Sequence, residues 1–193
     1  MTQSAINTER IGSALVITFM RPAIRNPLSV AVIEDLEQVL ADAKAEPLIE
    51  SVIFTGTGNV FASGADLREI AELSSQDAAA FGRRGQSLME RIGNAGRTIA
   101  AVNGFCFGGA LDLALACEMR VASPDAQFAH PGASLGIITG WGGTQRLPRL
   151  IGEARALEMF FTAAPVSAAR ALEIGLIDLV SKDVVSAALE LSH

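Results

Sequence analysis

The segment from Asn103 to Asp112, NGFCFGGALD, combines two kinds of group that can act on a carbonyl compound. A buried strand over Ile99–Val102 ends just before it, and Gly108-Gly109 opens a helix. The first N–H groups of a helix have no intrahelical partner and lie at the positive end of its dipole. They are therefore well placed to stabilise a developing oxyanion.

The second group is the carboxylate of Asp112, the one polar side chain in the predicted helix from Ala110 to Cys117. A helix that is apolar on all sides is buried, and an isolated buried carboxylate is costly. Asp112 therefore needs partners or a cavity, which is typical of a pocket acid, base or orienting group. A first-turn aspartate that only interacts with the helix dipole is the alternative, and this segment alone leaves both open.

A second segment, FASGADL at 61–67, has a similar combination of a glycine bend and a helix start. Gly64 permits a backbone conformation that other residues avoid, and Asp66 suits the first turn of a helix. If the fold brings the two segments together, the N–H of Ala65 converges with that of Gly109. Taken alone, the segment is explained as a strand-to-helix turn with an acidic first residue.

Two other classes of site are excluded by residue type and spacing. The run Gly56–Gly58 lacks the third glycine of a dinucleotide-binding fingerprint, whose place is taken by Phe61. Two histidines and two cysteines, Cys106 and Cys117, are too few for a nitrogen and sulfur metal cluster or a disulfide framework. We therefore expect the cysteines to be buried free thiols in a reducing compartment.

The sequence GASLG at 132–136 matches the nucleophile elbow of serine hydrolases. The elbow needs a strand before the serine and a helix after it, whereas Pro131 precedes this motif and no helix start follows. The only downstream histidine is the terminal His193. We therefore interpret Ser134 as a chance match.

Composition sets broad limits on the chain. Its 193 residues carry a net charge of −6, with 50% hydrophobic and 19% charged residues, which excludes disorder and indicates one sizeable core. An acidic chain lacks the basic surface that binds nucleic acid. The N-terminus is polar and no apolar run approaches a membrane span, so we expect an enzyme of the cytoplasm or of an organelle matrix, with a cytoplasmic location as the first choice. The mean hydropathy of +0.36 indicates apolar surface covered in subunit contacts.

The hydrophobic pattern predicts an α/β chain in which strands alternate with helices. The apolar runs predict strands at Ala14–Phe19, Ser51–Thr55, Ile99–Val102, Met119–Ala122, Gln127–Ala129 and Ile177–Val180. Helical spacing predicts helices at Val30–Ala43 after an N-cap at Ser29, Asp66–Glu72, Gln76–Ile92, Gly108–Cys117 and Val184–Leu191, with two or three more over 144–174.

Three motifs in this order resemble the enoyl-CoA hydratase/isomerase (crotonase) family. They are FASGADL at 61–67, AVNGFCFGGALDLALAC at 101–117 and GGTQRLP at 142–148. The resemblance extends over nearly the whole chain. It implies a crotonase (ClpP-like) fold of repeated strand-strand-helix units, acyl-CoA thioester substrates, and homotrimers or dimers of trimers. It implies no metal or redox cofactor, because CoA is part of the substrate.

The resemblance also implies roles for matched residues. The N–H groups of Ala65 and Gly109 would bind the thioester oxygen and stabilise an enolate. Asp112 falls on the first of two glutamates that hydratases use, as a carboxylate one methylene shorter. The acyl-CoA site would be lined by Ala65, Asp66, Leu67, Arg68, Gly109, Gly132 and Trp141. For Trp141 a packed core aromatic is the alternative.

The sequence departs from the hydratase pattern at the second glutamate, whose position is Gly132. Glycine has no side chain for acid–base work, so Ser134, or His130 from the wrong side of the turn, would have to substitute for it. Hydration or isomerisation that uses Asp112 with a compensating group or water is the default. The alternatives are decarboxylation or carbon–carbon bond chemistry on a CoA thioester, and a non-catalytic or truncated scaffold subunit.

The length is a second departure. Members of the family usually continue with helices that cover the acyl pocket, contribute to CoA binding and pack between subunits. We therefore expect residues 1–193 to form a single crotonase-like domain that lacks most of this C-terminal helical region.

Overall fold

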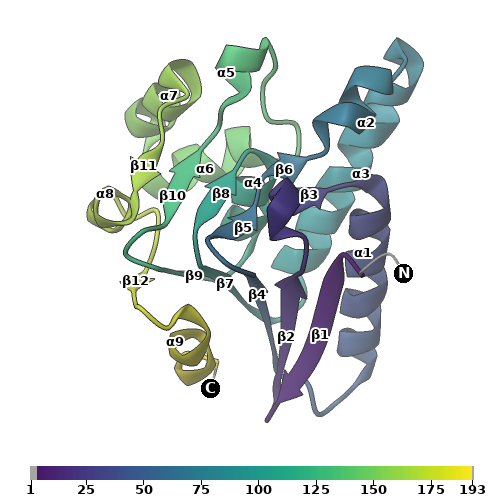
Figure 1. The fold of residues 1–193 in the computed structure, drawn as a ribbon, viewed down its shortest axis with the longest axis vertical. Helices are drawn as coiled ribbons and strands as arrows, with labels where there is room; N and C mark the ends of the chain where they lie inside the picture. The colour runs from purple at the N-terminus through teal and green to yellow at the C-terminus, as the bar shows by residue number, and fades with distance from the viewer. Residues whose placement is uncertain (1–3, 193) are drawn as a thin grey trace.

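The computed structural model of the chain describes residues 4–192 and is built on a six-stranded sheet (Figure 1). Its strands lie in the order β1-β2-β4-β7-β9-β12; β1 is antiparallel to β2, and the other neighbours are parallel. They are β1 (Ile6–Ile11), β2 (Ala14–Phe19), β4 (Ser51–Gly56), β7 (Arg97–Val102), β9 (Met119–Ala122) and β12 (Leu179–Val180). The predicted α/β class is confirmed.

Short strands form two further sheets above the ends of the long strands (Figure 1). The four-stranded sheet contains β11 (Val166–Ser167), β10 (Gln127–Ala129), β8 (Phe105–Phe107) and β5 (Val60–Ala62), and the pair contains β3 (Pro27–Leu28) and β6 (Gly64–Ala65). A long strand, a short strand and a helix follow one another repeatedly along the chain. This is the strand-strand-helix unit that the family resemblance implied.

Helices connect these strands and begin largely where predicted. They are α1 (Val30–Ala45), α2 (Leu67–Glu72), α3 (Ser75–Gly93), α4 (Gly109–Ala116), α5 (Gly132–Leu135), α6 (Gly143–Ile151), α7 (Glu153–Thr162), α8 (Ala168–Glu173) and α9 (Val184–Glu190), with a 3₁₀ turn, η1, at Pro22–Ile24. The side chains of Ser29 and Asp66 accept hydrogen bonds from first-turn amides of α1 and α2. These caps satisfy N–H groups that have no intrahelical partner.

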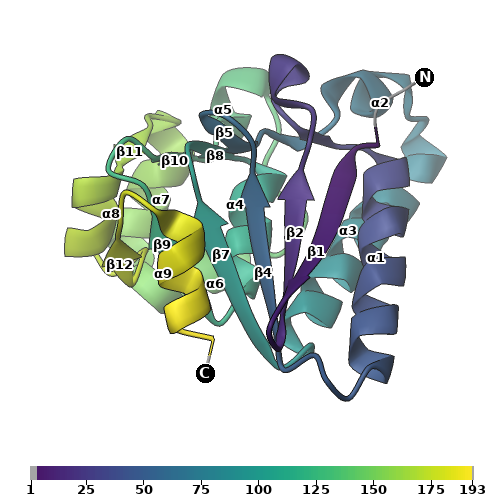
Figure 2. The ribbon, with the colours of Figure 1, turned by 60° about the horizontal axis from the view of Figure 1, so that its bottom comes forward.

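The large sheet is covered on both faces, because successive side chains of a strand point to opposite sides. Ile17, Phe54 and Val102 belong to the larger core, together with residues of α1, α3 and α4. Their neighbours Val16, Ile53 and others belong to a second cluster with α9. Figure 2 shows α9 on one side of the sheet and α1 and α3 on the other. Burial on both faces explains why these strands read as continuous apolar runs.

Other parts of the fold are not predicted from the sequence. In β1 only Ile6 is buried, so the strand carries no apolar alternation and is held by backbone pairing with β2. Strands such as β5 and β8 are three residues long, which is too short for a recognisable period. None of the helices within residues 4–192 has the length and apolar character needed to cross a bilayer.

Candidate active site

Two glycine-containing segments, β6 and the start of α4, lie directly against each other (Figure 1). A Cβ placed on Gly64 would lie 2.5 Å from the amide nitrogen of Gly109, and a Cβ placed on Gly109 would lie 3.3 Å from the amide nitrogen of Ala65. Gly64 has a φ of +85°, in the left-handed region that favours glycine. The amides of Ala65 and Gly109 are therefore neighbours, and Gly109, as the first residue of α4, has no intrahelical acceptor.

A cavity of about 310 Å³ opens beside these amides. Its walls come from β6, α2, α3, the start of α4, and the stretch from His130 through α5 to Trp141. Most of the lining side chains are apolar, including Leu67, Ile70, Phe81, Leu135 and Ile138. The cavity thus combines an apolar interior with a polar wall that contains the two amides, Asp112 and His130.

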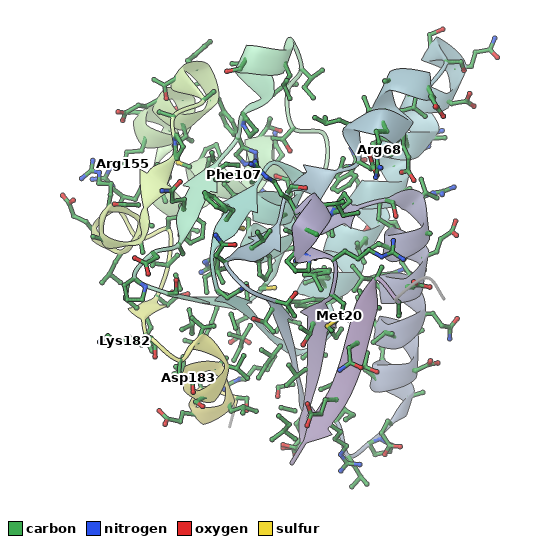
Figure 3. All side chains as sticks on the ribbon, in the orientation of Figure 1. Met20, Arg68, Phe107, Arg155, Lys182 and Asp183 are labelled. Carbon is green, nitrogen blue, oxygen red and sulfur yellow. The ribbon has the colours of Figure 1, made fainter. Side chains whose placement is uncertain are left out.

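The structure brings most of the predicted site residues to this cavity: Ala65, Leu67, Gly109, Asp112, Gly132 and Trp141 line it. Asp66 and Arg68 are not among the lining residues. The Asp66 carboxylate lies 2.6 Å from the guanidinium of Arg68, which lowers the pKa of Asp66. The Arg68 side chain, marked in Figure 3, is 74% exposed on α2. A contact of CoA with this ion pair would therefore be on the surface outside the cavity.

Asp112 is completely buried on α4. Burial raises its pKa to about 6, and the Thr139 hydroxyl, which donates a hydrogen bond to Oδ2, opposes this rise together with the nearby Arg146. The Oδ1 atom has no hydrogen-bond partner among residues 4–192. Asp112 therefore changes charge near neutral pH, and one of its buried carboxylate oxygens has unused capacity to accept a hydrogen bond.

We predict that Thr139→Val raises the pKa of Asp112 above about 6. The hydroxyl stabilises the ionised carboxylate, so removing it favours the protonated form. The measurement is a ¹³C NMR titration of labelled aspartate, with Asp112→Asn used to assign the signal. An unchanged or lower pKa in Thr139→Val would contradict the assigned role of the hydroxyl.

Trp141 fills space that two glycines leave open. A Cβ on Gly85 would lie 2.1 Å from the indole Nε1, and a Cβ on Gly109 would lie 2.5 Å from its Cε3. The Phe81 ring lies beside the indole, with 5.7 Å between ring centroids. Trp141 is 3% exposed and lines the cavity, so the two interpretations of this residue, pocket wall and packed aromatic, both describe it.

Gly132 begins α5, at a turn of the chain that has no room for a side chain. A Cβ there would lie 2.4 Å from the carbonyl oxygen of Ile137, whose amide donates a hydrogen bond of 3.0 Å back to the Gly132 oxygen. The expectation that His130 lies on the wrong side of this turn is wrong. Its Nε2 lies 3.6 Å from Oδ1 of Asp112, and both residues line the cavity.

The two other candidate chemistries gain no support. Ser134 is exposed, and the GASLG motif forms the short helix α5 itself rather than a turn that precedes a helix. His193 lies outside the described residues. Among residues 4–192, no three His, Cys, Asp or Glu side chains are grouped so that they could hold a metal ion.

The family model described as enoyl-CoA hydratase/isomerase matches residues 9–192. The chain belongs to the enoyl-CoA hydratase/isomerase family. The matched range includes both glycine segments, Asp112 and His130, so the whole candidate site lies within the family domain.

This family member is similar to curated proteins and to solved structures. It is 41% identical over 170 residues to a Bacillus subtilis protein named "Probable enoyl-CoA hydratase", covering 87% of this chain and 66% of that one. It is 37% identical to the short-chain-enoyl-CoA hydratase of Clostridium acetobutylicum, covering 89% and 67%. An enoyl-CoA hydratase structure from Bacillus anthracis matches with a TM-score of 0.93 at 34% identity, covering 98% and 75%. The chain thus spans about two thirds of the length of these curated relatives.

Proposed function

We propose that this chain catalyses the addition of water to the double bond of an enoyl-CoA thioester. The observation that carries the proposal is the contact between the Gly64–Ala65 and Gly108–Gly109 backbones at the wall of a cavity that Asp112 also lines. The names of the similar proteins support the same reaction, because several are enoyl-CoA hydratases.

The neighbouring amides of Ala65 and Gly109 would bind the thioester oxygen. When water attacks the β-carbon, negative charge develops on that oxygen, and two fixed N–H donors stabilise the enolate without reorganisation. Asp112, ionised above a pKa of about 6, is the carboxylate available to orient the water or accept its proton. No metal ion or redox cofactor is required for this addition.

The substrate would place its acyl chain among the apolar side chains of the cavity and its CoA group near the start of α2. Leu67 lines the cavity, and the exposed, positively charged Arg68 beside it is a candidate contact for CoA phosphates together with main chain at Asp66. Gly132 and Trp141 would contact the acyl part. The cavity volume of about 310 Å³ favours a short or medium acyl chain.

We predict that Trp141→Ala shifts acyl preference toward longer chains. The indole occupies the space beside Gly85 and Gly109, so its removal enlarges the cavity. The measurement is kcat/KM for enoyl-CoA substrates of increasing chain length. The ratio of longest to shortest substrate should rise by roughly tenfold or more, the scale of a few methylene groups in an apolar pocket. An equal loss for every chain length would contradict the assignment of Trp141 as the wall that limits length.

Hydration is tested by mixing the protein with crotonyl-CoA and following the loss of the conjugated-thioester absorbance. The proposal predicts turnover, and no turnover at high enzyme concentration would contradict it.

A second candidate is decarboxylation or carbon–carbon bond chemistry on a CoA thioester, which is favoured by the lack of a side chain at Gly132. Release of carbon dioxide from a carboxyacyl-CoA without hydration would select that candidate. Failure to bind any CoA thioester would leave a scaffold subunit.

We also propose that the chain forms a single crotonase-like domain that assembles as a homotrimer or a dimer of trimers. Helix α7 carries Phe161, which is 78% exposed, and Leu157, which is 51% exposed, and such apolar surface is typical of subunit contacts. The acidic composition argues against a nucleic-acid partner. Two buried free cysteines fit the expected cytoplasmic location. Sedimentation of the protein tests the assembly.

A further inference from the structure

The side chains of His130 and Asp112 face each other in the cavity wall. They are 3% and 0% exposed, and Nε2 of His130 lies 3.6 Å from Oδ1 of Asp112. Both ring nitrogens of His130 and this carboxylate oxygen lack a hydrogen-bond partner among residues 4–192. Buried polar atoms without partners are rare and costly, so three of them at one place need a reason other than packing.

The geometry around the pair fits a third polar atom. A separation of 3.6 Å is longer than a direct hydrogen bond, but one oxygen atom beside both groups can lie within hydrogen-bonding distance of each. Gly143 leaves the space beside both atoms free of a side chain, because a Cβ there would lie 2.2 Å from Oδ1 of Asp112 and 3.0 Å from Nε2 of His130. A water molecule or substrate oxygen between the two atoms would give each of them a hydrogen-bond partner.

Within residues 4–192, the other titratable groups around the pair are poorly suited to proton transfer at neutral pH. Arg146 on α6 is a fixed positive charge near Asp112, and Cys106 on β8 is a buried thiol whose pKa is raised well above its usual value by burial. The Phe160 ring packs against His130, with 5.2 Å between ring centroids. Position 132, which carries no side chain, is closed by the Ile137 carbonyl. His130, by contrast, is a titratable side chain that both lines the cavity and lies 3.6 Å from the Asp112 carboxylate.

We propose that His130 and Asp112 act together as the proton-transfer pair of the hydratase, with His130 supplying the function that Gly132 cannot. This inference rests on the proposed function. The water oxygen bonds to the β-carbon, and the π electrons of the double bond move to form the enolate held by the amides of Ala65 and Gly109. The proton of the water passes to Nε2 of His130. The imidazolium, stabilised by the Asp112 carboxylate, then gives a proton to the α-carbon as the thioester carbonyl re-forms.

At neutral pH the pair consists of a neutral imidazole and an ionised carboxylate. Burial lowers the pKa of His130 to about 4, so its ring is uncharged near pH 7. Asp112, with a pKa of about 6, is ionised there, and its negative charge favours a positive charge on the facing ring. The sequence adds H and OH to the double bond and returns both side chains to their starting states.

The test compares His130→Gln with wild type on crotonyl-CoA. We expect kcat to fall by roughly 100-fold, the scale of a positioned acid–base group, while the Kd for butyryl-CoA changes less than about threefold. Ser134→Ala is the control, because this exposed residue is four positions away and does not line the cavity. A kcat of His130→Gln within about threefold of wild type, in an enzyme that hydrates crotonyl-CoA, would overturn the inference and leave the proposed function intact.

A second readout does not depend on hydration. Exchange of the α-hydrogens of butyryl-CoA with solvent deuterium requires proton transfer at the α-carbon alone. Exchange that is lost in His130→Gln, in a protein that does not hydrate crotonyl-CoA, would support the pair and overturn the proposed reaction. Exchange that is independent of His130 would overturn the pair, and a wild type that neither hydrates nor exchanges would overturn both.

A third variant, His130→Gly, distinguishes loss of the imidazole group from misfolding of the protein. His130→Gly removes the imidazole, and added free imidazole should restore part of the lost rate, which a purely structural role of the ring would not permit. Proton exchange that stays at the wild-type rate in folded His130→Gly would contradict the inference directly.

Discussion

Asp112→Asn is expected to lower kcat for crotonyl-CoA hydration by roughly two or more orders of magnitude. The amide has nearly the same shape and can still accept the hydrogen bond from Thr139, but it carries no charge and takes no proton. The change therefore removes the chemistry of the carboxylate and keeps its packing. Steady-state kinetics, with active-site concentration measured by binding of butyryl-CoA, provide the comparison.

The free energy of unfolding of Asp112→Asn shows whether the variant loses activity because it loses the carboxylate or because it unfolds. The pKa of Asp112 is raised to about 6 in the folded protein from an ordinary value of 3.8, so ionisation of the carboxyl disfavours the folded state. The destabilising effect of the ionised Asp112 carboxylate grows as the pH rises from 3.8 to about 6, and it is complete above about pH 6. Asp112→Asn should therefore have an unfolding free energy at pH 8 equal to or above that of wild type. Asp125→Asn, an exposed control, should change neither property. A fully active Asp112→Asn enzyme would reduce Asp112 to a helix-start residue.

Gly64→Ala is expected to reduce kcat/KM by roughly 10²–10³-fold, the scale of losing one oxyanion donor. The new methyl group would lie 2.5 Å from the amide nitrogen of Gly109 and 2.8 Å from the carbonyl oxygen of Phe107. Neither neighbour is a flexible side chain, so the two backbones must move apart. Because the amides of Ala65 and Gly109 would then no longer be neighbours, a shared oxygen cannot be bound by both.

Gly96→Ala is the matched control for this change. Gly96 has a φ of +84°, almost the value at Gly64, but nothing lies within 4 Å of an added Cβ. It therefore carries the conformational strain of a left-handed alanine without the clash. Thermal unfolding should show that both variants lose stability, while only Gly64→Ala loses activity. Equal activities of the two variants would contradict the role given to the contact between the backbones.

The sequence predicts the parts of the fold that carry a long hydrophobic period or a clear cap. The strand at Ala14–Phe19 and the helix after Ser29 begin where expected, because burial and N-capping act locally. The exposed strand β1 and the three-residue strands β5 and β8 depend on pairing with distant segments, which no local pattern records. The two glycine segments were recognisable from residue type, and their contact was an expectation until the fold brought β6 against α4.

The contacts that Asp112 makes with Thr139 and His130 were harder to predict from the sequence than the two glycine segments. Thr139 lies 27 residues from Asp112 along the chain, in a loop without regular structure, and no spacing signals its hydrogen bond. His130 offered one signal, since it directly follows strand β10, whose partner β8 leads into the Gly108-Gly109 turn. Its position 3.6 Å from the Asp112 carboxylate follows from the packing of β10 against β8 and of β8 against α4, which the sequence alone does not reveal.

A crystal structure of the protein with bound butyryl-CoA would test the shared binding of one oxygen by two amides. We expect the thioester oxygen to lie roughly 2.7–3.2 Å from the amide nitrogens of both Ala65 and Gly109, the range of N–H···O hydrogen bonds. A bound thioester whose carbonyl oxygen contacts neither nitrogen, or lies outside the cavity beside Asp112, would contradict this account of the site.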